Sequence, residues 1–145
     1  MEPPRGQVAL GLRIAEALLA GATLDAEDRR LVAEGVAAAW RWVEGSPADP
    51  EILCALIDGE PNLPLRSTRY AGGGPGRDAM VAAFLAIGLA ARHACDEAGL
   101  PPTESVAEFG ENELDRLRDR LGRLGADDRA RILAAGMGRG PDEPA

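Results

Sequence analysis

Apolar residues recur at intervals of three and four along most of this chain, and a glycine stands near the end of each such run. This spacing places the apolar side chains on one face of an α-helix. The stripe residues of the first run are Val8, Leu12, Ala15 and Leu19. They predict a helix over residues 7–20 that stops at Gly21, because glycine readily adopts the backbone conformation that ends a helix.

Two aspartates mark the starts of the next two helices. The Asp25 carboxylate can accept a hydrogen bond from a backbone N–H of the first turn, which has no partner within the helix, and that helix continues to Glu44. Asp49 precedes Pro50, and proline is favoured at the first helical position because the N–H that it lacks would be unpaired there. We therefore predict a short third helix over residues 50–58.

A segment rich in proline and glycine follows. Residues 60–76 contain three prolines and the run Gly72-Gly73-Gly74, so no regular element is expected there. Such a long loop in a compact domain is either functional or mobile. The fourth predicted helix, over residues 77–98, is apolar on all sides between residues 79 and 91, which is typical of the buried centre of a helical bundle.

The C-terminal part of the chain is more polar. A narrow apolar stripe flanked by arginines predicts a fifth helix. The members of this stripe are Leu114, Leu117, Leu121 and Leu124. One or two further helical turns are expected over residues 127–135, and we expect residues 1–6 and the tail 136–145 to be disordered. The chain is thus predicted to be a single all-α domain over residues 7–135, a bundle of about five to six helices with the long loop between the third and the fourth.

Composition and charge narrow the class of partner. A length of 145 residues with 46% hydrophobic residues is enough for one core. The formal net charge of -8 repels nucleic-acid phosphates and anionic lipids. The apolar run over residues 79–91 is also shorter than the roughly 20 residues that cross a bilayer. We expect a cytoplasmic protein whose partner is a basic protein, with neither nucleic acid nor a membrane as a partner.

No group of residues in the sequence indicates catalysis or metal binding. Cys54 and Cys95 are too few for a disulfide framework, lack the paired spacing of metal ligands and suggest a reducing compartment. An enzyme would have to use Cys95, His93 and Asp96, which share no helical face, whereas a nucleophile needs its base within hydrogen-bond reach. We therefore expect no enzyme activity, no cofactor and no metal.

The two tryptophans cannot face the same way, since helical residues two positions apart point about 200° apart. The apolar face of the second helix is formed by Val32, Val36, Ala39 and Val43. We assign Trp40, which adjoins this face, to the core. Trp42 is then a candidate interface anchor, and the alternative is that it only covers the third helix.

Charged residues supply the other candidates for partner binding. Asp58 and Glu60 lie at the end of the third helix. A longer acidic stretch contains Glu104, Glu108, Glu111, Glu113 and Asp115, and its members Glu104, Glu108 and Glu111 form the second acidic cluster considered for partner binding. These carboxylates suit a basic patch on a partner, and the alternative is a solvated face whose charges favour a helix dipole. The long loop adds the candidates Arg66, Arg69 and Tyr70, which suit an acidic patch.

The order of these features is itself distinctive. An aromatic-ended helix, Trp40-x-Trp42-x-x-Gly45, precedes a short helix that closes on Asp58-Gly59-Glu60. A helix rich in small residues then leads to Leu100-Pro101-Pro102 and an acidic stretch. Over about residues 31–117 this order resembles the all-α immunity proteins of bacterial polymorphic-toxin systems. The chain departs from that pattern in its expanded 61–76 loop and in its lack of lysine.

The resemblance implies a non-catalytic protein that binds a cognate toxin and neutralises it. An acidic inhibitor suits a toxin that is basic because it acts on nucleic acid, since the inhibitor can occupy the surface that binds phosphates. The alternative is a cytoplasmic helical interaction or regulatory module of another bacterial pathway, which would bind its partner through Trp42 and the 61–76 loop.

Overall fold

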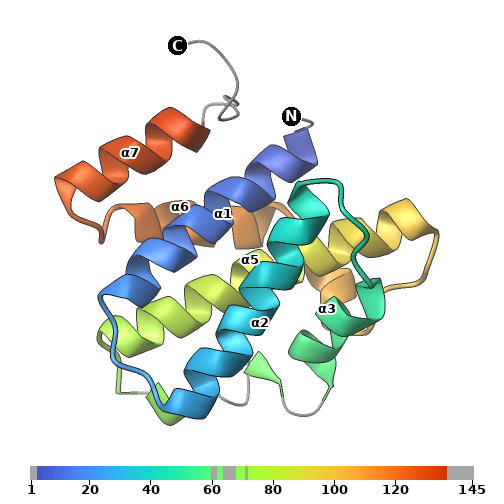
Figure 1. The fold of residues 1–145 in the computed structure, drawn as a ribbon, viewed down its shortest axis with the longest axis horizontal. Coiled ribbons are helices and arrows are strands. Elements are labelled where there is room, and N and C mark those ends of the chain that lie inside the picture. The colour runs from blue at the N-terminus through green and yellow to red at the C-terminus, as the bar shows by residue number, and fades with distance from the viewer. Residues whose placement is uncertain (1–2, 60–61, 64–67, 71, 137–145) are drawn as a thin grey trace.

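The computed structural model describes residues 3–59, 62–63, 68–70 and 72–136 (Figure 1). These residues form six α-helices and no strand, so the predicted all-α bundle is confirmed. The α-helices are α1 (Pro3–Ala20), α2 (Ala26–Val43), α3 (Pro50–Asp58), α5 (Pro75–Ala98), α6 (Glu111–Leu121) and α7 (Ala126–Gly136). Two 3₁₀ turns are η1 (Thr68–Tyr70), in the long loop, and η2 (Val106–Glu108), before α6.

Helix α5 is the centre of the bundle. Helices α1, α2, α3 and α6 all pack against it (Figure 1). Between residues 79 and 91 every residue is buried except Phe84, which is partly exposed. Helix α5 is longer than its apolar run, and it is long and apolar enough to cross a membrane, with a mean hydropathy of 1.4 over its most apolar window. Its neighbours nevertheless bury 78% of that window.

Glycines allow the helices to approach α5 closely. A Cβ atom on Gly35 of α2 would lie 2.7 Å from Cδ1 of Ile87. A Cβ on Gly88 of α5 would lie 2.1 Å from Cε2 of Phe109, which follows η2. Separations this short are steric overlaps, so α2 and the segment before α6 can pack here only because these positions lack a side chain.

Several helix ends are formed by the residues that predicted them, although α5 starts at Pro75, two residues before the predicted start. The Asp25 carboxylate accepts a hydrogen bond from the Glu27 N–H at 3.0 Å, and the Asp49 carboxylate accepts one from the Glu51 N–H at 2.9 Å. Gly99 ends α5 in the left-handed conformation with φ of 70°, which a residue with a side chain adopts only with strain. The chain can therefore turn back sharply after α5.

The N-terminal helix begins earlier than predicted. Residues 3–6 were expected to be disordered, but α1 starts at Pro3. Proline fits the first helical turn, where the missing N–H costs no hydrogen bond. The Arg5 guanidinium also holds this end, because it forms an ion pair with Glu97 at 2.7 Å and donates a hydrogen bond to the Trp42 carbonyl at 3.2 Å. The expected disorder of residues 137–145 concerns residues outside the described part of the chain.

Replacing Gly88 with Ala should lower the free energy of unfolding by about 1–3 kcal/mol, because the new methyl group overlaps the buried Phe109 ring. The measurement is equilibrium denaturation in urea. In a Phe109→Ala background the same glycine substitution should cost much less, since the overlapping ring is gone.

Gly6→Ala is the matched control, because a Cβ on Gly6 of α1 meets no atom within 4 Å. Alanine favours the helix, so this variant should be neutral or more stable by up to about 1 kcal/mol. Equal losses for Gly6→Ala and Gly88→Ala would contradict the close packing of Phe109 on α5.

Candidate functional site

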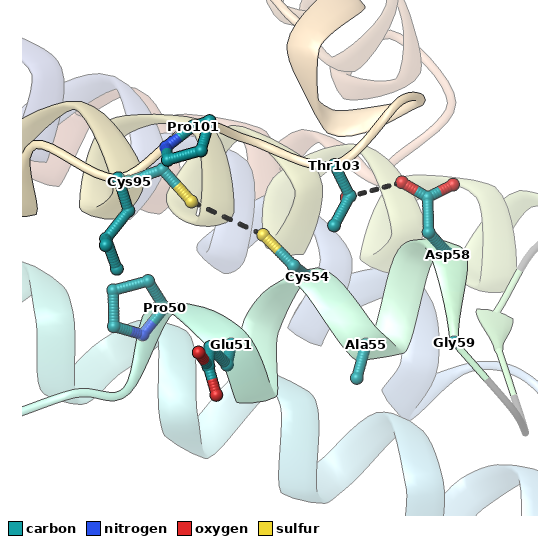
Figure 2. A pocket seen from close by; sticks show the side chains of 10 residues that line it. Pro50, Glu51, Cys54, Ala55, Asp58, Gly59, Cys95, Pro101 and Thr103 are labelled. Atoms are coloured by element: carbon teal, nitrogen blue, oxygen red, sulfur yellow. Dashed lines mark hydrogen bonds between the residues drawn. The ribbon is translucent and has the colours of Figure 1, made fainter.

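One hollow in the described surface lies between α3 and the chain that follows α5 (Figure 2). It has a volume of about 460 Å³. Its lining residues are Pro50, Glu51, Cys54, Ala55, Asp58, Gly59, Cys95, Leu100, Pro101 and Thr103. We call it the α3–α5 pocket. Apolar side chains line most of it, and two carboxylates lie at its edge.

Local sequence signals place the two walls of this pocket. Asp49 and Pro50 start α3, which forms one wall. The left-handed turn at Gly99 sends the chain back, and the two prolines that follow prevent α5 from continuing. Leu100 consequently remains 43% exposed at the pocket.

Asp58 joins the two walls. Its Oδ2 atom accepts hydrogen bonds from the Thr103 hydroxyl at 2.5 Å and from the Ser105 N–H at 3.0 Å (Figure 2). Partial desolvation acts to raise the pKa of Asp58, but hydrogen bonds from Ser105 and Thr103 outweigh it and hold the pKa below the ordinary value of 3.8. This candidate residue therefore has a structural role, and its side chain remains at the exposed edge of the pocket.

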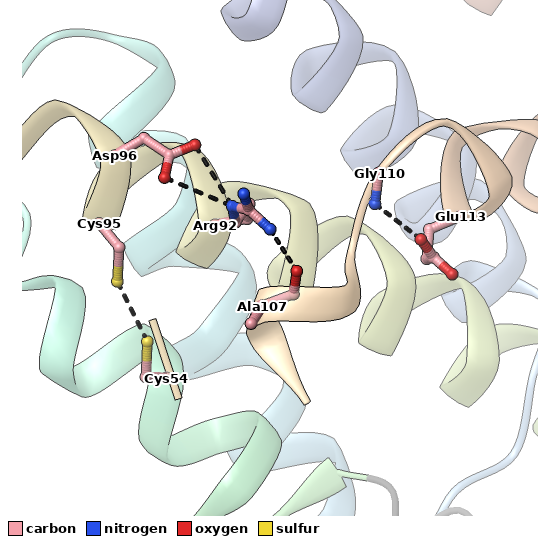
Figure 3. A network of polar contacts seen from close by, with 7 residues as sticks. All are labelled: Cys54, Arg92, Cys95, Asp96, Ala107, Gly110 and Glu113. Carbon is pink, nitrogen blue, oxygen red and sulfur yellow. Dashed lines mark hydrogen bonds and ion pairs between the residues drawn. The ribbon is translucent and has the colours of Figure 1, made fainter. Parts of the chain in front are cut away.

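Two thiols meet inside the pocket. The Sγ atoms of Cys54 on α3 and Cys95 on α5 lie 3.4 Å apart, although 41 positions separate the residues in the sequence (Figures 2 and 3). Both cysteines are buried. Burial raises the pKa of the Cys95 thiol to about 11, and the neighbouring Cys54 and Asp96 add to this effect while Arg92 opposes it. The sequence did not predict that these two cysteines are in contact.

The second acidic cluster begins beside the pocket, because Glu104 follows the lining residue Thr103 in the sequence. Its residues Glu104, Glu108 and Glu111 are all exposed, and in the described part of the chain no arginine forms an ion pair with them. The segment that carries them is held firmly. The Arg92 guanidinium of α5 donates a hydrogen bond to the Ala107 carbonyl and pairs with Asp96 (Figure 3).

The candidates from the long loop are only partly described. Glu60 and Arg66 lie outside the described residues, as does the side chain of Arg69. The Tyr70 hydroxyl donates a hydrogen bond to the buried Asp28 at 2.8 Å and accepts one from the Asp25 N–H at 3.0 Å. Burial is the largest influence on Tyr70 and raises its pKa, the Asp28 and Asp25 carboxylates add to this effect, and the Asp25 N–H opposes it. The hydroxyl ties η1 to the start of α2.

The assignment of the two tryptophans was wrong. Trp42 is the core residue, only 4% exposed, and its ring stacks on His93 with the ring centres 5.8 Å apart. The Arg5 guanidinium also lies over this ring, 4.5 Å from its centre. Trp40 is partly exposed, and its indole N–H donates a hydrogen bond to Glu16 at 3.1 Å. Trp42 is therefore not available as a surface anchor.

Helical geometry explains this error. The two tryptophans flank the apolar face of α2 on opposite sides, so the period of the helix does not distinguish between them. The side that packs against α5 also carries Gly35, which contacts Ile87 and Leu56. A glycine on the Trp42 side of the face was the overlooked signal of close helix packing.

The three residues considered for an enzyme do not converge. His93 stacks on Trp42, Cys95 lies against Cys54, and Asp96 pairs with Arg92. Burial is the largest influence on His93 and lowers its pKa below 6.5, which favours the neutral ring beside Trp42. The chemistry of the site thus lies in the pocket, its thiols and its carboxylates. The sequence did not mark Glu51 or Leu100 as site residues and did not predict the thiol pair, since only the packing of α3 against α5 brings these residues together.

Trp42→Ala should lower the free energy of unfolding by about 3–5 kcal/mol, because it removes a buried ring and leaves a cavity. Trp40→Ala is the matched control and should cost less than half as much, since that ring is partly solvated. Urea denaturation followed by far-ultraviolet circular dichroism measures both. A larger loss for Trp40→Ala would contradict the observed packing of α2.

Asp58→Asn should destabilise the domain at neutral pH, because the charge that the hydrogen bonds of Thr103 and Ser105 favour is lost. The folded-state pKa of Asp58 is depressed, so its contribution exists above pH 3.8 and declines as the pH falls below that value. The difference in unfolding free energy between wild type and variant, measured from pH 7 to pH 3, should therefore shrink at the acid end. A difference that is constant with pH would contradict this role.

No family model, curated protein or solved structure matches this chain. What the protein does is therefore inferred from its own surface and from the resemblance carried by the residues quoted above.

Proposed function

We propose that this chain is an immunity protein that binds a basic bacterial toxin and neutralises it. The observation that carries the proposal is the acidic edge of the α3–α5 pocket. Glu51 and Asp58 border an apolar hollow, and the exposed Glu104 follows its Thr103 wall. The formal net charge of -8 extends the same negative field over the whole chain.

The shape and chemistry of this surface suit a particular kind of contact. An apolar side chain of the partner can enter between α3 and Leu100, where it loses contact with water. A neighbouring arginine or lysine can then reach the Glu51 carboxylate, which is exposed at the edge. Binding would thus combine an apolar anchor with charge pairing around it.

The second acidic cluster has a different part in this proposal. Glu104, Glu108 and Glu111 project from a segment that Arg92 and Asp58 hold in place, so their charges need little ordering when a partner arrives. Exposed charges of this kind mainly accelerate the encounter with an oppositely charged surface. A toxin that acts on nucleic acid offers such a surface, and an inhibitor seated there excludes the substrate phosphates.

Co-expression with the toxin encoded by a neighbouring gene tests the proposed function. The chain should restore growth of cells that express its cognate toxin, and it should co-purify with that toxin. Failure of a well-expressed chain to rescue growth against every neighbouring toxin candidate would overturn the proposal. Isolation of a basic partner from another pathway would also overturn it and would favour the regulatory module instead.

Reversing the charge of Glu104, Glu108 and Glu111 to lysine should slow association with the toxin by on the order of tenfold or more at low salt. The effect should shrink as the salt concentration rises, because exposed charges are screened. Stopped-flow or surface-plasmon measurements give the association rate, and circular dichroism checks that the domain stays folded.

A control variant with the same change in net charge separates a local contact from the general field. Glu34, Glu44 and Asp127 are exposed residues on or beside α2 and α7, and their reversal should slow association much less. Equal effects of the two triple variants would show that the second acidic cluster does not face the toxin.

A further inference from the structure

Cys54 and Cys95 form an isolated pair of thiols that nothing in the proposed binding contact uses. They come from different helices, α3 and α5, and their side chains point toward each other within the pocket (Figure 2). Both are buried, yet both line the α3–α5 pocket, so a small molecule that enters the pocket reaches them without unfolding of the chain.

We propose that Cys54 and Cys95 are a redox-sensitive site at which a hydroperoxide forms a reversible disulfide between α3 and α5. The site takes its oxidant through the α3–α5 pocket, and the bond fixes the α3 wall of that pocket. This inference does not rest on the proposed function, because it concerns the isolated chain.

The distance between the sulfur atoms permits this bond. The Sγ atoms must approach from 3.4 Å to the roughly 2.05 Å of a disulfide, a change that side-chain rotation and a small shift of α3 can supply. Helix α3 has only nine residues and lies at the outside of the bundle (Figure 1), and Gly59 follows its last residue. A short outer helix can move by a fraction of an ångström more easily than the central α5 can.

The reaction is balanced with one hydroperoxide. One thiolate attacks an oxygen of the peroxide, the O–O bond breaks, and water or an alcohol leaves, which gives a sulfenic acid. The second sulfur then attacks the sulfenic sulfur, so that the S–S bond forms, the S–O bond breaks and a further water leaves. Overall, two thiols lose two electrons and two protons, and the peroxide accepts them.

The surroundings of the thiols set the rate of this oxidation. The pKa of Cys95 is about 11, so little of its thiolate exists at neutral pH, and the thiolate is the reactive form. Cys95 therefore reacts slowly and only with sustained peroxide, in contrast to an exposed sensor thiol with a low pKa. Because the two sulfurs are close, a sulfenic acid on either cysteine has the other thiol beside it, and the product is the Cys54–Cys95 disulfide.

The disulfide would change the stability of the domain. It would close a loop of chain spanning 41 positions, which reduces the freedom of the unfolded state. For a domain of this size, the melting temperature should rise by about 10 °C. The same bond would prevent α3 from moving away from α5 and so would make the pocket rigid.

The experiment treats the reduced, folded full chain with hydrogen peroxide, removes the peroxide and labels free thiols with N-ethylmaleimide. Intact mass spectrometry should show an unlabelled monomer that is two hydrogens lighter, and peptide mapping should find Cys54 joined to Cys95. The melting temperature should rise as stated and should return after treatment with dithiothreitol, which does not reverse oxidation of methionine or tryptophan.

Cys54→Ser and Cys95→Ala are the controls, and peroxide should not raise the melting temperature of either. Two labelled thiols in the peroxide-treated wild type, at a peroxide dose that fully oxidises the urea-unfolded chain, would overturn the proposal. Disulfide-linked dimers or separate oxidation of each cysteine to sulfinic acid would also overturn it. A disulfide that forms without raising the melting temperature would contradict the fixing of α3.

Discussion

The structure depends on the burial of a helix that is apolar on every side. Helix α5 can be stable in water only if other helices cover it around its whole circumference, since each exposed apolar side chain forfeits its hydrophobic stabilisation. Small residues allow the neighbouring helices to cover α5 closely. Gly35 and Gly88 bring Ile87 and Phe109 into contact with neighbouring elements at distances that a side chain would forbid. Every other helix is placed by its contact with α5 or with a helix that contacts it.

The candidate site lies where the apolar part of α5 ends. The last turns of α5 become polar, and there Arg92, His93, Cys95 and Glu97 each bind a different element of the chain. These contacts hold η2, Trp42, α3 and the start of α1 around the end of one helix. The left-handed turn at Gly99 then leaves the hollow between α3 and the returning chain. The pocket and its acidic edge are therefore built on a rigid base.

Short sequence signals, such as helix caps and apolar runs, predicted much of the fold. Asp25 and Asp49 form the caps expected of them, and the apolar run of α5 is central as its composition requires. Contacts between distant segments were not predictable in this way. The helical period of α2 places Trp40 and Trp42 at equivalent edges of the apolar face, and packing against α5 determines which of the two is buried. The thiol pair joins residues 41 positions apart, and no local pattern records such a contact.

The same distinction applies to the candidate partner residues. Glu104, Glu108 and Glu111 are exposed as predicted, because charge alone determines that they face water. Asp58 and Tyr70 were chosen for their polarity, but each forms hydrogen bonds within the fold that the sequence does not show. Polar residues near a loop thus divide into those that form hydrogen bonds within the fold and those that remain exposed to solvent, and only the structure separates the two groups.

Under the proposed function, the toxin binds at the α3–α5 pocket and its acidic edge. Hydrogen–deuterium exchange of the chain, compared between the free chain and its complex with the cognate toxin, locates the surface that the toxin covers. We expect the toxin to slow exchange in residues 50–59 and 100–111 and to leave the exposed side of α1 and α2 around Trp40 unchanged. A second hollow lies between α1 and α2 and is lined by Glu16, Val36 and Trp40. Protection confined to that hollow, with none at the α3–α5 pocket, would contradict the proposal.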